Sequence, residues 1–283
     1  MKLIATPFLL LLTLFSFGVV KAQQIQMPQA SPAATISQKI GLTDVKLEYS
    51  RPSVKDRKIF GTLVPYGEVW RTGANASTKI TFSTPVSVEG HDVPAGTYAL
   101  YAIPNKKEWT FVLSENLELW GAIGYTPDND VLRFTVPSQK SKEYYETMEL
   151  SFNDMTDTGA TLNLHWEKTG VGFRIETEVD QVVMSQIQEM VIDTQSDNPG
   201  LLYQAASYYY NNDKDMEQAH EWIKTSVEAD PKYWTVHLKA KIEDKLGLTQ
   251  EAIQSAEMSK QLADEAKNMD YVNLNDRLIK ALQ

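Results

Sequence analysis

The sequence predicts two structural classes in one chain. A β-rich N-terminal part, built as an antiparallel sandwich or a partly closed barrel, is followed by an all-α part of helical hairpins. Two observations predict this. Apolar residues recur at every second position over residues 35–180, and they recur at helical spacing over residues 181–283. Because the 283 residues include no cysteine, apolar packing and not disulfide bonds must hold the fold together.

The first 22 residues are predicted to be a signal peptide. Lys2 gives a positive start, residues 3–20 are almost continuously apolar, and Val20-Lys21-Ala22 offers small residues for cleavage. A retained membrane anchor is the alternative. The small-residue exit favours cleavage, and we therefore expect an exported protein, periplasmic or secreted, without a stable membrane anchor. Residues 23–34, rich in Gln, Pro, Ala and Ser, are predicted to form a flexible leader.

Residues 35–180 are predicted to form the β part. Val45, Leu47 and Tyr49 alternate with polar residues, as half-buried antiparallel strands require. The same alternation recurs at residues 80–82, 86–88, 132–136, 148–152, 162–166 and 171–175. Turn signals such as Glu89-Gly90 and Thr158-Gly159 separate these runs. The pattern predicts about ten short strands.

Residues 181–283 are predicted to be helical, because good helix formers dominate and strand-like alternation stops. Aromatic, small and bulky residues then fall at the spacing of a tetratricopeptide repeat, namely at Tyr203, Ala206, Tyr210, Ala219, Ile223, Ser226 and Pro231. A weaker copy runs through Ala240, Ala252, Ala256 and Ser259. An unrelated bundle of five or six helices is the alternative. Either arrangement offers faces that could hold a protein partner.

Charge and composition exclude several functions. The net charge of −10 argues against sequence-independent binding of nucleic acid, which needs a basic face. The four histidines are scattered without metal-ligand spacing, and no motif for a cofactor is present, so neither a metal nor a cofactor is predicted. No catalytic residues are assigned.

The segment from Ser50 to Asn75 holds the candidate ligand site. It contains three of the six arginines of an acidic chain, and it does not alternate like its neighbours. Arginine binds carboxylate or phosphate with two parallel hydrogen bonds, and glycine lets backbone N–H groups approach a ligand. We therefore predict a pocket for a small anionic or carbohydrate ligand, with these candidate residues: Arg51, Arg57, Trp70, Arg71, Thr72 and Asn75. The alternative is that these arginines pin a long loop while Trp70 fills the core.

Several strings in this region also resemble a known family. They include Tyr49-Ser50-Arg51-Pro52-Ser53, Leu63-Val64-Pro65-Tyr66-Gly67, Val69-Trp70-Arg71-Thr72-Gly73-Ala74-Asn75 and Pro94-Ala95-Gly96-Thr97-Tyr98. Over roughly residues 36–176 the chain resembles the exported β family catalogued as domain of unknown function 2911. The resemblance implies an exported β domain of Bacteroidota-type bacteria, often with helical repeats appended, but no catalytic residues and no substrate. Asp56 stands where the resemblance implies a glycine.

Three hypotheses follow. The first is a non-enzymatic binding protein with a ligand site on the β part and a protein-binding helical arm. The second is a hydrolase of envelope polymers, in which Asp128, Asp130 or His91 joins Arg71 and Asn75. The third is a structural scaffold whose sheet positions the helical repeat.

Overall fold

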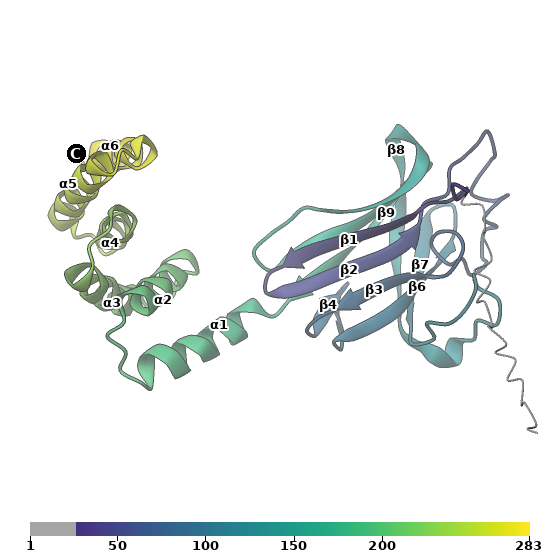
Figure 1. Cartoon of the computed structure of the whole chain (residues 1–283), viewed down its shortest axis with the longest axis horizontal. Coiled ribbons are helices and arrows are strands. Elements are labelled where there is room, and N and C mark those ends of the chain that lie inside the picture. Colours follow the sequence, from purple (N-terminus) through teal and green to yellow (C-terminus); the bar gives the residue numbers. More distant parts are fainter. Residues whose placement is uncertain (1–26) are drawn as a thin grey trace, which may run out of the picture.

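The computed structural model describes residues 27–283 and places all strands before the α-helices, with one 3-10 turn, η1 (Pro127–Asn129), ahead of β8 (Figure 1). The predicted signal peptide, residues 1–22, and leader residues 23–26 lie outside the described residues. The strands are β1 (Ala33–Ile40), β2 (Thr43–Ser50), β3 (Thr78–Phe82), β4 (Val86–Val88), β5 (His91–Val93), β6 (Gly96–Pro104), β7 (Glu108–Ser114), β8 (Asp130–Asn153) and β9 (Gly159–Thr177). They form one nine-stranded sheet in the order β1-β2-β3-β6-β7-β8-β9-β4-β5. The antiparallel β-rich prediction is confirmed, as a sheet that does not close into a barrel.

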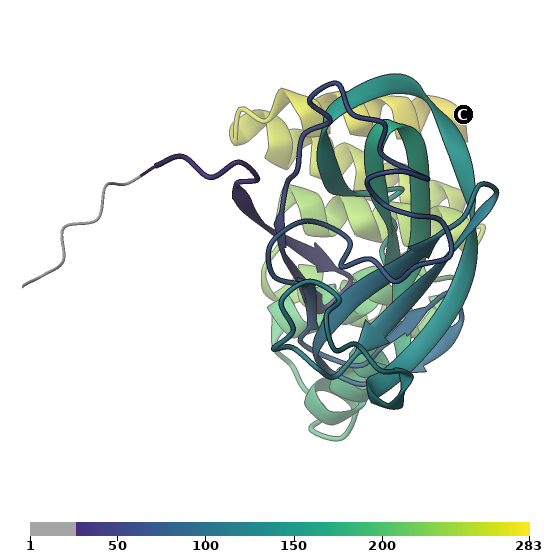
Figure 2. The same cartoon turned by 90° about the vertical axis from the view of Figure 1, so that its right-hand side faces the viewer.

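Strand β8 joins two layers of this sheet. Residues 130–137 pair with β7, and residues 138–153 pair with β9. The prediction of about ten short strands is wrong here, because the runs 132–136 and 148–152 belong to this one strand of 24 residues. The polar stretch between those runs looked like a connection, but it stays in the sheet through irregular pairing with β9. Figure 2 shows β8 in teal along the edge of the β part.

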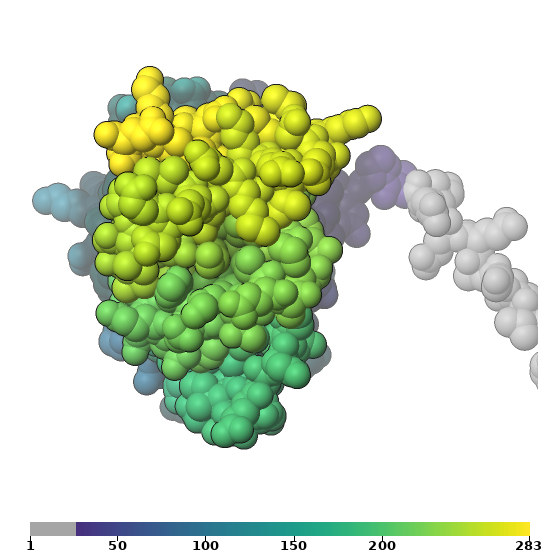
Figure 3. All heavy atoms as spheres, turned by 90° about the vertical axis from the view of Figure 1, so that its left-hand side faces the viewer, coloured from purple at the N-terminus to yellow at the C-terminus, as the bar shows by residue number. Residues whose placement is uncertain are grey.

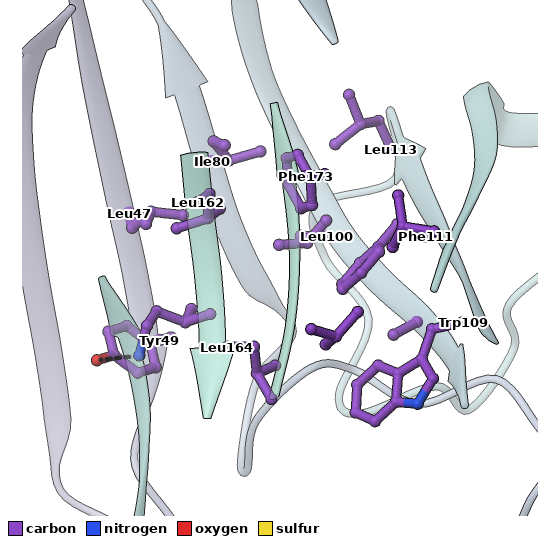
Figure 4. Close-up of a cluster of buried hydrophobic side chains, with 14 of the residues drawn as sticks. Leu47, Tyr49, Ile80, Leu100, Trp109, Phe111, Leu113, Leu162, Leu164 and Phe173 are labelled. Atoms are coloured by element: carbon purple, nitrogen blue, oxygen red, sulfur yellow. Dashed lines mark hydrogen bonds between the residues drawn. The ribbon is translucent and has the colours of Figure 1, made fainter. Parts of the chain in front are cut away.

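The core lies between the two layers. Leu47, Ile80 and Leu100 come from β2, β3 and β6, and they face Leu162 and Phe173 of β9 (Figure 4). All five side chains are buried, which is what their period of two predicts for one face of each strand. The hydroxyl of Tyr49 accepts a hydrogen bond of 3.2 Å from the backbone N–H of Leu150, and this bond links the layers inside the core.

The ends of the β part differ slightly from the expected bounds. Strand β1 begins at Ala33, so residues 33 and 34 of the expected leader pair with Ser50 and Tyr49 of β2. At the other end, β9 stops at Thr177 and the first helix begins at Val179.

The C-terminal part is all-α, as the sequence predicts, and it contains six α-helices. They are α1 (Val179–Ile187), α2 (Pro199–Asn211), α3 (Met216–Ala229), α4 (Tyr233–Lys245), α5 (Thr249–Glu265) and α6 (Met269–Leu282), and a π-helical turn, η2 (Gln188–Ile192), follows α1. The helices stack in chain order, from green to yellow in Figure 3. Their buried cluster, which includes Leu202, Ile223 and Val236, is separate from the core of the sheet. None of the helices in residues 27–283 is long and apolar enough to cross a membrane.

Two helical hairpins repeat one contact. Helix α2 begins at Pro199 and α4 begins at Tyr233, 34 residues later. The Ser226 hydroxyl of α3 donates to the carbonyl oxygen of Pro199 at 2.8 Å, and the Ser259 hydroxyl of α5 donates to the carbonyl oxygen of Tyr233 at 2.6 Å. Fully buried alanines at 206, 219, 240 and 252 let the paired helices approach each other closely.

Candidate functional site

Two of the predicted site arginines are bonded to backbone carbonyls. The Arg51 Nε donates to the carbonyl oxygen of Met148 at 3.0 Å, and its Nη2 lies 3.8 Å from a carboxylate oxygen of Glu149. The Arg57 guanidinium folds back on its own loop, where it donates to the carbonyl oxygens of Val54 at 2.9 Å and Ser53 at 2.6 Å. Both side chains fasten the loop that follows β2.

Trp70 and Asn75 also have structural partners. Trp70 is buried, stacks on Trp166 with a centroid distance of 5.9 Å, and donates from Nε1 to the carbonyl oxygen of Gly73 at 3.0 Å. The Asn75 amide donates to the carbonyl oxygen of Ser31 and to the Ser50 hydroxyl, at 3.2 Å each. Asn75 has a φ of 61°, a backbone conformation that asparagine tolerates better than most residues.

Arg71 and Thr72 differ from the other four candidates. No acidic side chain among residues 27–283 pairs with Arg71, and its buried Nε has no hydrogen-bond partner there. Thr72 is fully buried with a φ of 54°, and its hydroxyl likewise lacks a partner. The structure therefore does not bring the six candidates together on one open surface; four of them are used in folding and two are left without partners.

Among residues 27–283, the His91, Asp128 and Asp130 side chains of the hydrolase hypothesis form no hydrogen bond or ion pair with Arg71 or Asn75. His91 sits in the β4–β5 hairpin at one edge of the sheet. Asp130 accepts hydrogen bonds from the Tyr125 hydroxyl, at 2.7 Å and 2.9 Å, and from Arg133 Nε at 2.5 Å. Burial and this bond to Asp130 raise the pKa of Tyr125 to about 12, so its hydroxyl keeps its proton. Among residues 27–283, no three His, Asp or Glu side chains gather closely enough to hold a metal ion.

A basic cleft lies where the long loop after β2 meets β7, β8 and β9. Its volume is about 340 Å³. Four lysines from four separate segments line it, namely Lys58, Lys106, Lys140 and Lys168, together with one acid, Glu167. None of these four ammonium groups has an ion pair or hydrogen bond within residues 27–283. We call this feature the lysine cleft.

The walls and floor of the lysine cleft are aromatic and polar. Trp109 and Phe60 are buried at its base, and the Tyr66 ring, 38% exposed, lies over Gly61 at its edge. Neutral hydrogen-bonding groups from Asn105, Ser138, Gln139 and Thr169 complete the lining. Like charges grouped in one cleft raise the local potential and attract anions.

The pairing of β8 with β9 creates the lysine cleft. Lys140 lies opposite Thr169 in the ladder, which brings Lys168 to the same end of the sheet. The Ser138 hydroxyl donates to the carbonyl oxygen of Lys106 at 3.3 Å, and this bond fixes the β6–β7 turn beside the cleft. Lys58 lies in the segment from Ser50 to Asn75, which the sequence singles out, but the other three lysines lie outside it, and only the strand register makes them its neighbours.

Comparison with known proteins identifies the β part alone. A family model described as "Protein of unknown function (DUF2911)" matches residues 31–175, which is 145 of the 283 residues. No curated protein and no solved structure matches the chain. The match contains β1 to β8 and β9 as far as Ile175, and it includes the candidate residues 51–75 and all four cleft lysines. The chain therefore belongs to the DUF2911 family of proteins of unknown function.

Proposed function

We propose that this chain is an exported, non-enzymatic binding protein whose β part holds a small acidic carbohydrate in the lysine cleft. One observation carries the proposal: in a chain of net charge −10, one cleft is surrounded by four lysines that have no ionic partner among residues 27–283. A cleft of about 340 Å³ is at the lower end of the range for small-molecule sites, ~300–1,000 Å³.

The chemistry of the lining supports an acidic sugar. Lysine ammonium groups attract carboxylate or sulfate groups, and the neutral amides and hydroxyls can bond sugar hydroxyls. The half-exposed ring of Tyr66 offers an apolar face to a sugar ring. Glu167 in the same lining accepts hydrogen bonds from hydroxyl groups, which a sugar supplies.

Isothermal titration tests the site. The probes are a galacturonate trisaccharide and a sulfated disaccharide, with neutral cellobiose as the uncharged comparison. We expect the acidic probes to bind, more weakly as salt rises, and the double variant Lys106→Glu/Lys168→Glu to lose at least tenfold in affinity. Lys224→Glu, an exposed charge reversal on α3, is the matched control. Absence of binding by both acidic probes, or an equal loss in the control, contradicts the proposal.

The export proposal rests on residues 1–22, which the sequence alone describes. Mass spectrometry of the protein recovered from the native cells tests it. We expect the mature chain to begin at Gln23 and to be found outside the cytoplasmic fraction. A chain that keeps residues 1–22 contradicts cleavage.

We further propose that the helices form a tetratricopeptide-like array that docks a protein segment. The spacing of 34 residues between the starts of α2 and α4, and the repeated serine contacts, support the repeat. Lys241 and Lys245 of α4 lie over the ring of Tyr210 of α2, at 4.5 Å and 4.7 Å. Lys245 also pairs with Asp213, so Lys241 is the cation that this aromatic face offers to a partner. In a cross-linking experiment with the full chain, the cross-link to the protein partner should be lost in Lys241→Glu/Lys245→Glu. It should be kept in the control variant Lys224→Glu.

A further inference from the structure

A second groove lies next to the lysine cleft, on the outer face of β8 and β9. Its volume is about 580 Å³, against about 340 Å³ for the cleft. Gln139 and Lys140 of β8 line both of them. In β9, Lys168 and Thr169 line the cleft, and the next residue, Gly170, lines the second groove. We call this second feature the outer groove.

The edge of β8 between the lysine cleft and the outer groove is open. Strand β7 pairs with β8 only as far as Pro137, and the backbone N–H of Ser138 donates to the carbonyl oxygen of Lys107 at 2.9 Å. Within residues 27–283, no strand pairs with Gln139 or Lys140 on that side of β8. Both residues are exposed, so a chain of sugar units that leaves the cleft can pass over them into the outer groove.

The floor of the outer groove is a flat hydrogen-bonding surface. Strand β9 reverses at Glu167, which has a φ of 55°, so that His165 lies beside Gly170 and Asn163 lies beside Gly172. A Cβ atom at Gly170 would lie 3.0 Å from the imidazole ring, and one at Gly172 would collide with the amide oxygen of Asn163. The two glycines therefore let the imidazole and the amide lie across the strand.

The polar groups of this floor are accessible to a ligand. Among residues 27–283, the Asn163 side chain makes one hydrogen bond, from Nδ2 to the carbonyl oxygen of Thr161 at 3.4 Å, so its Oδ1 atom has no donor there. Neither this oxygen nor the Nε2 atom of His165 is enclosed, in contrast to His165 Nδ1. The ring of Tyr145 stacks on the imidazole with a centroid distance of 4.6 Å and holds it in place.

The charges of the outer groove differ from those of the lysine cleft. Lys140 and Lys142 line the groove together with Glu143 and Asp154, so cations and acids are equal in number, whereas the cleft has four lysines and one acid. Amides and hydroxyls, which can donate to and accept from the hydroxyl groups of an uncharged sugar, come from Gln139, Ser141, Thr161 and Asn163. The outer groove therefore fits neutral sugar units, and the cleft fits an acidic unit.

We propose that the ligand is an oligosaccharide with one acidic unit, which binds in the lysine cleft, and several neutral units, which cross Gln139 and Lys140 into the outer groove. This inference rests on the proposed function of the lysine cleft and defines its ligand class more closely. A chain with acidic groups throughout would bring negative charges close to Glu143 and Asp154, which disfavours its binding in the outer groove.

Isothermal titration of the full mature chain tests the continuous site. The probes are glucuronosyl-xylotriose, which has one acidic and three neutral units, and its two parts, glucuronate and xylotriose. We expect the tetrasaccharide to bind at least tenfold more tightly than either part, because it fills both the cleft and the groove. Lys106→Glu/Lys168→Glu should weaken the binding of the tetrasaccharide and of glucuronate, each by at least tenfold.

Two variants separate the outer groove from the cleft. Asn163→Ala should weaken the binding of the tetrasaccharide at least fivefold and leave the binding of glucuronate unchanged. Asp154→Asn should give the same pattern, and it keeps the fold because asparagine tolerates the φ of 49° at this exposed position. Ser87→Ala, a half-buried change on β4 outside the groove, is the matched control and should leave both affinities unchanged.

The possible failures are distinguishable. If the tetrasaccharide binds no more tightly than glucuronate, or if both groove variants bind it as the wild type does, the continuous site is overturned while the lysine cleft is retained. If neither the tetrasaccharide nor glucuronate binds at millimolar concentration, and the acidic probes of the cleft also fail to bind, the proposed function is overturned with it.

Discussion

The guanidinium of Arg71 occupies the space where residue 121 would carry its Cβ atom, which only glycine leaves free. Gly121 also has a φ of 73°. We predict that Gly121→Ala destabilises the fold by ~1–3 kcal/mol, through backbone strain and displacement of Arg71. Urea unfolding measures the loss.

A matched control separates the two causes. Gly90 has a φ of 80°, and a Cβ there meets no atom within 4 Å. Gly90→Ala should therefore show the backbone strain alone. Equal losses in the two variants would mean that the contact between Arg71 and Gly121 contributes nothing.

The two equivalent serines should differ in their contribution to stability. Ser226→Ala removes one buried hydrogen bond, to the carbonyl oxygen of Pro199, at a cost of about 1 kcal/mol. Ser259→Ala should cost more, because the same hydroxyl also accepts a bond of 2.8 Å from the fully buried Asn275 amide. Thermal unfolding measures both, and Thr225→Ala, on an exposed face of α3, should change little. A larger loss in Ser226→Ala would contradict this order.

Two separate cores predict two unfolding transitions. Leu47 and Ile223 are both fully buried, one in each core. Calorimetry of the full chain should show that Leu47→Ala lowers one transition and Ile223→Ala the other, each by ~2–5 kcal/mol of unfolding free energy. A single transition lowered by both variants would show that the parts unfold together.

His237 should make the helical part acid-sensitive. Burial lowers the pKa of His237 below the ordinary value of 6.5, and the nearby charge of Lys241 lowers it further. The hydrogen bond of 2.7 Å from His237 Nδ1 to Asn275 Oδ1 opposes this shift. The folded chain therefore holds this ring neutral, whereas the unfolded chain protonates it below about pH 6.5.

Stability from His237 is thus complete above pH 6.5 and declines as the pH falls through its lowered pKa. Urea unfolding at pH 7.5 and pH 5 should show a smaller acid-induced loss in His237→Gln than in wild type. His91→Gln, a change at an exposed position on β5, should keep the wild-type loss. An unchanged loss in His237→Gln would contradict the prediction.

Local patterning was sufficient to predict the fold class. Leu47 and Ile80 alternate with polar neighbours because one face of each strand is buried, and that relation exists within each short segment. The continuity of β8 was not predictable in this way. Its middle is polar on both faces, so its strand conformation depends on the irregular pairing with β9, which the local pattern does not contain.

The site was predictable only in part, because many of its contacts join residues that are distant in the sequence. The motif around Arg71 identified a region with unusual backbone and unpartnered donors. The roles of Arg51 and Asn75 depended on Met148 and Ser31, which are distant in sequence. The lysine cleft joins residues 58 and 168, and no spacing rule connects residues so far apart.

Strand β8 has a mechanical consequence. The first third of β8 is hydrogen-bonded to β7 and the remainder is hydrogen-bonded to β9. A stretching force along β8 must therefore break both sets of hydrogen bonds by shear before the β part extends. The α-helices have no single long element that spans the whole array. The same load would therefore unfold them one hairpin after another. In a force–extension experiment, the helical array should unfold first, in several steps at low force. The sheet should then unfold in one step at high force.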